Sequence, residues 1–284
     1  MRTALLLALI LSALIALPIA ARRGESPPWR WDGFQPLGDA STQSGHPRRI
    51  EHIATGIVLV HIPAGRFLRG SPPDERFHQR NEALLEATVE RPFYMTETEL
   101  TVAQWRRVMG ETPLPQERED LPVSGVSWYR SQELVSALQE RHGVGWRLPT
   151  EVEWEYACRA GTTTPFSFGE RIDDSLANFD ARHPYPPGSK GEFRGGPVPV
   201  KSFPPNPWGL YEMHGNLWEW CEDLYVPYLD EGAVAVDEPG APRVIRGGGF
   251  TAMGKRCRSA YRDGYPPGSP GEKYGVRLVY SAPF

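Results

Sequence analysis

The chain has 284 residues, of which 40% are hydrophobic and 11% aromatic, so it is long enough to bury the core of one large domain or two small ones. Its formal net charge is −4 and no run of Lys and Arg stands out, which gives no indication of a nucleic-acid-binding surface. Gly and Pro number 29 each, a content that predicts a loop-rich fold with short strands and few helices.

The first 21 residues are predicted to be an export segment. Met1 and Arg2 precede an uncharged run from Thr3 to Ala21 that is rich in Leu, Ala and Ile, as in secretory signals. Pro18 disfavours cleavage after Ala20, and the run is at the short limit for crossing a bilayer, so cleavage and retention as an anchor both stay open. We expect a periplasmic or secreted protein, either free or held at the inner membrane by this segment.

Residues 22–56 are predicted to be a linker or an irregular N-terminal arm. They are polar, contain several prolines and show no sustained period. Three aromatic residues, Trp29, Trp31 and Phe34, either fix this arm to the following domain or stay exposed.

The folded domain is predicted to span residues 57–284 and to begin with two strands. The run Ile57 to Ile62 is apolar and β-branched, a turn follows at Pro63 to Gly65, and Arg66 to Leu68 continue as a second strand.

Three helices are predicted from their N-terminal caps. Thr101 with Gln104 and Thr150 with Glu153 have the spacing of capping boxes, and Ser127 precedes a run with an apolar stripe. We expect these helices over residues 101–110, 128–142 and 150–159.

No further helix is predicted after Ala160. Short apolar runs recur between Gly, Pro, Asn and Asp, for example Val198 to Phe203, Arg243 to Ile245 and Gly275 to Tyr280. No repeat of a fixed length is visible, which excludes solenoids and propellers. The pattern predicts a single α+β domain.

Seven segments, in order, give the domain a resemblance to the formylglycine-generating-enzyme (sulfatase-modifying factor) family. The two most specific contain RLPTEVEWEYA and GLYEMHGNLWEW. The segments are Ile62–Ser71, Glu97–Trp105, Pro122–Gln132, Trp146–Gly161, Phe203–Asp223, Arg243–Phe250, and Cys257–Arg262 with Tyr274–Val279. The resemblance implies an elaborated C-type-lectin-like α+β fold with little regular secondary structure.

The resemblance also implies structural calcium, a cation that takes carboxylate and carbonyl oxygens. One implied site uses the side chains of Glu212 and Glu219 with the carbonyls of Gly215 and Leu217. The family often has Asn where this chain has Glu212, and Glu keeps an oxygen ligand. A second implied site uses Asn178 and the carbonyl of Phe179, with Glu192 as the candidate acid that closes it. Structural salt bridges are the alternative role for such carboxylates.

Copper is not expected. Formylglycine formation in the family uses two thiolates to bind Cu(I), and a single sulfur holds this ion poorly. Counting from the Gly247-Gly248 pair places Gly249 and Ala252 at the family's serine and first cysteine. Only Cys257 falls on the second cysteine, so it is the one candidate catalytic residue.

Cys257 has a second interpretation. Counting backward from Gly275 places it near a structural cysteine of the family, whose partner corresponds to Cys158. The resemblance therefore implies a Cys158–Cys257 disulfide, with Cys221 left over. In an oxidising compartment any two of the three cysteines have the opportunity to pair.

Three functions remain open. The first is a modification or maturation factor, or an oxidoreductase, that acts on an exported protein or peptide or on a periplasmic small molecule without copper formylglycine chemistry. The second is a catalytically silent lectin-like module that binds a peptide or glycan. The third is a true formylglycine-generating oxidase for sulfatases. Membrane contact is expected only through the N-terminal segment.

Overall fold

The structure, a computed structural model, describes residues 31–38, 41–42, 45–227 and 237–282. The predicted export segment and Trp29 lie outside these residues. Among the helices that the structure describes, none is both long and apolar enough to cross a membrane.

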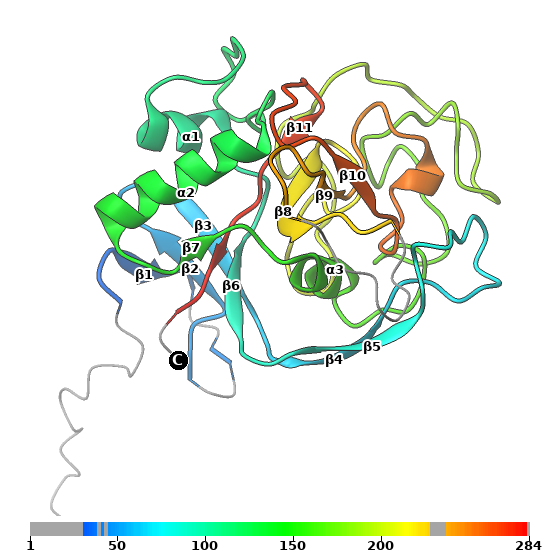
Figure 1. The fold of residues 1–284 in the computed structure, drawn as a ribbon, viewed down its shortest axis with the longest axis horizontal. Helices are drawn as coiled ribbons and strands as arrows, with labels where there is room; N and C mark the ends of the chain where they lie inside the picture. Colours follow the sequence, from blue (N-terminus) through cyan, green and yellow to red (C-terminus); the bar gives the residue numbers. More distant parts are fainter. Residues whose placement is uncertain (1–30, 39–40, 43–44, 228–236, 283–284) are drawn as a thin grey trace, which may run out of the picture.

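A six-stranded antiparallel sheet forms one half of the domain (Figure 1). Its order is β1 (Phe34–Pro36), β2 (Arg49–His52), β3 (Ile57–Ile62), β6 (Phe93–Thr96), β12 (Val279–Tyr280) and β7 (Trp146–Arg147). The bounds predicted for β3 are confirmed. The core over this sheet joins Leu59 and Tyr94 of the strands to Trp105 and Leu134 of two helices.

The N-terminal arm belongs to this sheet, so the predicted linker 22–56 is wrong over part of its length. Phe34 of β1 pairs with His52 of β2, and β2 pairs with β3. Trp31 and Phe34 pack against the core, which settles their role. These edge strands are three and four residues long, too short to show a period in the sequence.

The three predicted helices are confirmed to within one residue at each end. They are α1 (Val102–Met109), α2 (Trp128–His142) and α3 (Glu151–Arg159). Both predicted capping boxes form: the hydroxyls of Thr101 and Thr150 accept hydrogen bonds from the backbone amides of Gln104 and Glu153, whose side chains accept in return. Ser127 caps α2 in the simpler way.

The other half of the domain consists mainly of loops around two smaller sheets (Figure 1). One has the order β10 (Asp263–Tyr265), β9 (Arg243–Arg246), β8 (Trp218–Leu224) and β11 (Tyr274–Gly275). In the other, β4 (Gly65–Arg69) pairs with β5 (Leu85–Val89), so the strand predicted after β3 joins a different sheet. Val198 to Phe203 form no strand, and η1 (Gly254–Arg256) is a single 3-10 turn.

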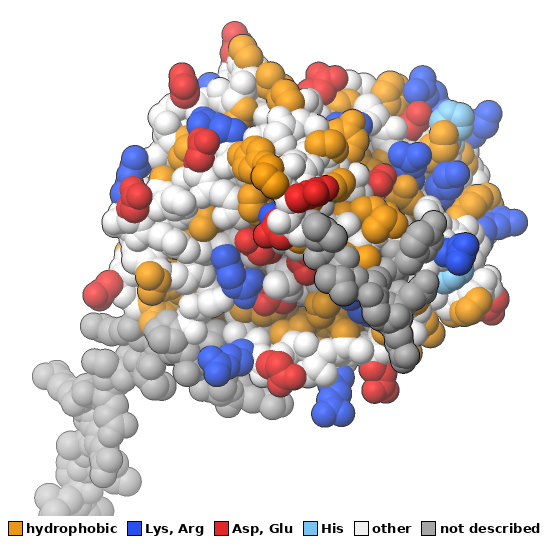
Figure 2. Space-filling view, in the orientation of Figure 1, with side chains coloured by type: hydrophobic (Ala, Val, Ile, Leu, Met, Phe, Trp, Pro, Cys, Tyr) orange, Lys and Arg blue, Asp and Glu red, His pale blue; other side chains and the backbone are white. Residues whose placement is uncertain are grey.

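The helices and the larger sheet therefore support a loop-built half whose core runs through β8 and α3. Trp154 of α3 and Trp220 of β8 are fully buried there. Figure 2 shows charges of both signs on the surface of the same view, with Lys and Arg gathered at the loop end where η1 lies in Figure 1.

Candidate functional site

Glu219 of β8 is held by an arginine from the segment between β11 and β12. Arg277 is fully buried and donates to both Glu219 carboxylate oxygens at 2.8–3.0 Å. The Trp154 indole donates to Glu219 Oε2 at 2.6 Å. Three N–H groups thus donate to this carboxylate, one of them shared between both oxygens, and a guanidinium stands where a metal ion would neutralise the charge of Glu219.

Glu99 is a second buried carboxylate in this cluster. Its oxygens accept from the Leu217 backbone amide at 2.9 Å and from Asn216 Nδ2 at 2.7 Å. Burial, and next the charge of Glu219, raise the pKa of Glu99 well above its ordinary value. Glu99 and Arg277 were not among the predicted site residues. The available signal for Arg277 was its place between the apolar residues Val276 and Leu278, whereas Glu99 stands in a polar stretch that gives no such signal.

Glu212 differs from these carboxylates because neither of its oxygens accepts a hydrogen bond of full geometry. Both are buried, and the backbone amides of residues 201–203 lie close enough to lower the pKa of Glu212 without completing such a bond. Burial raises the pKa of Glu212 to about 7, an effect that the neighbouring backbone of Lys201 and the Arg277 charge reduce. The charges of Glu219, Glu99 and Glu212 all act on the guanidinium of Arg277, so this arginine is the cation that the three carboxylates share.

The residues of the second implied calcium site lie beside Gly215. Asn178 Nδ2 donates to the Gly196 carbonyl at 2.9 Å and to Asn216 Oδ1 at 3.1 Å, while its own Oδ1 is buried and accepts no hydrogen bond within the described residues. Gly215 has φ +90°, and a Cβ there would lie 2.4 Å from the Asn178 carbonyl. This close approach requires glycine.

The remaining predicted ligands are placed differently. The Phe179 carbonyl accepts from Ala181 at 2.9 Å, which leaves it one lone pair. The Glu192 carboxylate is 66% exposed and lies 3.7 Å from Arg194. Within the described part of the chain, no three His, Cys, Asp or Glu side chains are grouped to hold a metal. Among the predicted ligands that act through a side chain, Glu212 and Asn178 have buried oxygens without a hydrogen bond in the described part of the chain.

The three cysteines are free, buried thiols, so the predicted Cys158–Cys257 disulfide is not formed. Cys158 Sγ lies 3.7 Å from Ser259 Oγ and 3.7 Å from His214 Nε2. The side chain that faces Cys158 is therefore Ser259, two residues beyond Cys257.

Cys257 lies on the other side of His214. The Cys257 carbonyl accepts from His214 Nδ1 at 2.7 Å, and its Sγ rests so close to Gly248 that a Cβ on that glycine would come within 2.6 Å. His214 Nε2 accepts from the Ser167 amide at 3.0 Å. The backbone partners of both ring nitrogens thus fix the neutral tautomer with its proton on Nδ1.

Neither the thiols nor this imidazole are charged near neutral pH. Burial raises the pKa of Cys158 to about 12 and moves the pKa values of Cys221 and Cys257 upward in the same direction. Burial lowers the pKa of His214 to about 4. A thiolate–imidazolium pair between Cys158 and His214 is therefore disfavoured, because burial opposes the charged form of both side chains.

The positions of the family's serine and first cysteine carry no reactive group. Ala252 is buried beside the Phe250 turn, and the Ala252 amide donates to the Gly249 carbonyl at 2.7 Å. A Cβ on Gly249 would lie 3.1 Å from the Trp218 ring. With one buried thiol and no second thiol in this segment, the residues do not fit the two-thiolate copper(I) centre of the family.

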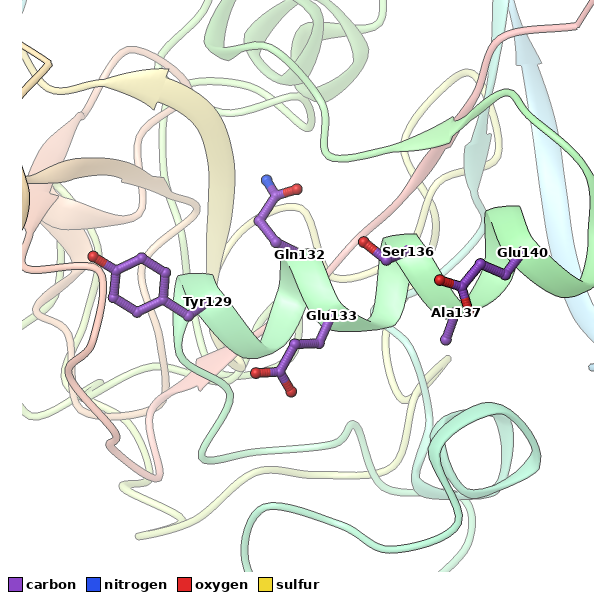
Figure 3. Close-up of a pocket in the computed structure, with 6 residues that line it drawn as sticks. All are labelled: Tyr129, Gln132, Glu133, Ser136, Ala137 and Glu140. Carbon is purple, nitrogen blue, oxygen red and sulfur yellow. The ribbon is translucent and has the colours of Figure 1, made fainter.

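The surface cavities around α2 and α3 offer no redox group either. A groove of about 580 Å³ follows the outer face of α2, where the side chains shown in Figure 3 carry amide, hydroxyl, carboxylate and phenol groups and one methyl group. A larger cavity of about 820 Å³ lies between the β5–β6 turn and the start of α3, with Arg147 and Glu153 paired in its wall. Both cavities are built from elements other than the segment 247–257.

Comparison with known protein families gives one domain match. The model of the sulfatase-modifying factor enzyme 1-like domain matches residues 49–282. This match starts at β2, in agreement with the place of that strand in the sheet.

Characterised relatives carry different names. The serine/threonine-protein kinase pkn1 of Chlamydia caviae is 32% identical over 250 residues, 78% of this chain and 37% of that protein. The formylglycine-generating enzyme of Bos taurus is 34% identical over 188 residues, 62% of this chain and 48% of that protein. The inactive C-alpha-formylglycine-generating enzyme 2 of Mus musculus is 34% identical over 189 residues, which are 63% of this chain and 56% of that protein. The chain thus spans about half the length of these relatives or less.

Among solved structures, PvdO from Pseudomonas aeruginosa superposes with a TM-score of 0.71 at 25% identity. The superposition covers 82% of this chain and 97% of PvdO.

Proposed function

Since the chain belongs to the sulfatase-modifying factor enzyme 1-like family, which includes the formylglycine-generating enzymes, we propose that it is a member without thiolate–copper oxidase chemistry that binds an exported protein and assists its maturation. The family and the α+β fold class predicted from the sequence are confirmed by the domain match and by the superposition on PvdO. The observation that carries the proposal is the burial of all three cysteines as free thiols.

The energetic argument concerns the thiolate. Copper(I) is bound by thiolates, and a thiol with a pKa of about 12 is almost entirely protonated near neutral pH. At the family's copper positions, Cys257 is buried, burial raises the pKa of its thiol in the same direction, and Ala252 supplies no second thiol. The chain is 34% identical both to a formylglycine-generating enzyme and to an inactive relative, so overall identity does not distinguish the two activities. The residues at the copper positions are therefore the basis of the proposal.

Export and partner binding rest on two further features. The apolar run of residues 3–21 supports export, because it follows a positively charged start as secretory signals do. Partner binding is supported by the loop-built half, since long loops on a rigid framework carry binding sites in many folds. Arg277 with Glu219 and Arg258 with Glu82 are two of the buried ion pairs that stiffen this framework.

Calcium remains a proposed structural ligand, at Glu212 and at Asn178. The support is the burial of their side-chain oxygens without hydrogen bonds, which a hard cation would satisfy. Glu219 does not fit this role because Arg277 neutralises its charge and both Arg277 and Trp154 donate to its oxygens. In this proposal Glu212 is the ionised ligand at one position and the Asn178 amide oxygen is the neutral ligand at the other.

A peptide assay tests the proposal that the protein lacks copper oxidase activity. The protein is incubated with a sulfatase-type peptide that carries the Cys-x-Pro-x-Arg motif, with copper, oxygen and a reductant, and the peptide mass is followed. We expect the peptide to keep its thiol. An aldehyde product that disappears in Cys257→Ser would overturn the proposal. A bacterial formylglycine-generating enzyme assayed in parallel shows that the conditions support turnover.

A further inference from the structure

Three segments far apart in the sequence meet at the loop end of the molecule. They are the loop between β4 and β5, residues 182–187, and η1 with the residue before it (Figure 1). The Tyr185 hydroxyl donates to the Arg76 carbonyl at 3.1 Å, and the amide of Gly254 donates to the His183 carbonyl at 3.0 Å. We name the surface formed by Arg76, Phe77, Arg182, His183, Met253, Lys255 and Arg256 the basic face.

A buried arginine fixes the basic face from below. Arg258 is buried and pairs with Glu82 at 2.7 Å and Glu75 at 2.6 Å. It also donates to the backbone carbonyls of Phe77 at 2.8 Å and Lys255 at 3.0 Å. The loop that carries Phe77 and the turn that carries Lys255 are therefore held in one arrangement before any partner arrives.

The charge of the basic face opposes that of the whole protein. Arg76, Lys255 and Arg256 form no ion pair within the described residues, whereas the chain as a whole carries −4. Arg182 forms an ion pair with Asp180 at 2.8 Å. The Arg182 side chain is 57% exposed and that of Asp180 is 11% exposed, so the surface of this pair is mainly the guanidinium. Figure 2 shows Lys and Arg gathered at this end. Such a local excess of one sign attracts partners of the other sign.

Two apolar side chains stand out among these cations. Phe77 is 42% exposed and Met253 is 41% exposed, and the Lys255 ammonium lies 5.5 Å from the Phe77 ring centre. Phe77 also has φ +65°, a left-handed conformation that is a steric outlier for an aromatic residue. The fold thus keeps an aromatic ring at the surface in a strained conformation, as is found at binding sites.

We infer that the basic face docks an acidic peptide segment that carries an apolar anchor residue, which contacts Phe77 and Met253 while its carboxylates meet Arg76, Lys255 and Arg256. The exposed aromatic and thioether groups favour a peptide over a sulfated or phosphorylated polysaccharide, since a polysaccharide has no apolar side chain to cover them. The inference deepens the proposed function, because it names the chemistry of the partner that the protein would bind.

The test uses the full chain and fluorescence anisotropy. The probe is a short labelled peptide in which Glu alternates with Leu and Phe; the comparison ligands are the same peptide with Lys for Glu, a peptide of Glu alone, and heparin. We expect only the Glu–Leu–Phe peptide to bind well, with affinity that falls as salt rises. Lys255→Glu combined with Arg256→Glu is expected to weaken it roughly tenfold or more.

The apolar contribution has its own variant. Phe77→Asn keeps a residue that tolerates the left-handed conformation but removes a ring contact with Tyr185 at 5.6 Å, so folding of the variant is verified by circular dichroism, and the folded variant should bind the peptide roughly tenfold more weakly. The matched control is Arg91→Glu, an exposed arginine in the β5–β6 turn, which should leave binding unchanged.

Two results would overturn the inference. One is absent binding of the Glu–Leu–Phe peptide, or binding that both basic-face variants leave intact. The other is equal binding of heparin and the Glu-only peptide with no effect of Phe77→Asn, which assigns the face to a polyanion instead. Neither result touches the claim about oxidase chemistry, which fails separately if the sulfatase-type peptide gains an aldehyde.

Discussion

At the scale of single residues, Arg277 organises the centre of the loop-built half. Three buried carboxylates, Glu99, Glu212 and Glu219, act on one guanidinium, and only Glu219 contacts it with a full set of hydrogen bonds. An arginine therefore supplies charge neutralisation that we expected from calcium at Glu219. Glu212 is left with unsatisfied oxygens, and its titration is the measurable consequence.

Glu212 should make stability depend on pH when divalent cations are chelated. The pKa of Glu212 is raised to about 7 in the folded protein, so between its ordinary value of 4.5 and 7 the native state holds a proton that the unfolded chain has lost. Stability should fall as pH rises through this window, by about 3 kcal/mol in total. Glu212→Gln should make the curve measured by urea unfolding from about pH 5 to about pH 8 less steep, and the slope that remains belongs to other carboxyls with a raised pKa, such as Glu99.

Calcium should reverse this loss only where Glu212 is present. Binding to the native state alone raises its stability by mass action, so the wild type should gain stability with calcium above neutral pH and Glu212→Gln should gain less. If the stability of the two proteins in chelator changed with pH in the same way, the titration would not belong to Glu212. If both proteins gained the same stability with calcium, Glu212 would not be a calcium ligand.

The number of free thiols distinguishes the structure, which has three, from the predicted disulfide, which would leave one. Denatured without reductant, the protein should present three thiols to a colorimetric reagent, because Cys158, Cys221 and Cys257 are all free. The folded protein should react slowly, since burial raises all three thiol pKa values. A count of one thiol would restore the disulfide and contradict this account of Cys158 and Ser259.

At the scale of elements, local signals predicted the helices well. A capping box lies within four residues of sequence, so Thr101 and Thr150 marked the start of α1 and α3 without any knowledge of the fold. Strands β1 and β2 were missed because a short edge strand is defined by its partner, which here is β3. Strand β4 was predicted, but its pairing was not, because its partner β5 is recognisable only in the folded structure.

The cap of α3 should contribute measurably to stability. Thr150→Ala removes the hydroxyl that accepts from the Glu153 amide at 3.2 Å and leaves a backbone donor unsatisfied. We expect a loss of about 1 kcal/mol in the free energy of unfolding from urea denaturation. Thr150→Ser keeps the acceptor and should lose less than half of that. Equal losses in the two variants would show that the methyl group, and not the cap, is responsible.

At the scale of the whole molecule, the sequence identified the family because several segments with specific side chains recur in order along the chain. What it left out are contacts between segments. Glu99 and Leu217 are 118 residues apart, and Arg277 and Glu219 are 58 apart, so no local pattern reports that they touch. The basic face has the same origin, since Phe77 and Lys255 come from opposite ends of the domain.

The central claim is that this member of the family lacks a thiolate site for copper(I). The direct measurement is a competition titration in which the reduced protein and a chromophoric copper(I) chelator share the metal. We predict that the chelator keeps its copper and that Cys257→Ser behaves like the wild type, because Cys257 is buried and protonated and Ala252 supplies no second sulfur. Withdrawal of one copper per chain from the chelator, lost in Cys257→Ser, would contradict the claim.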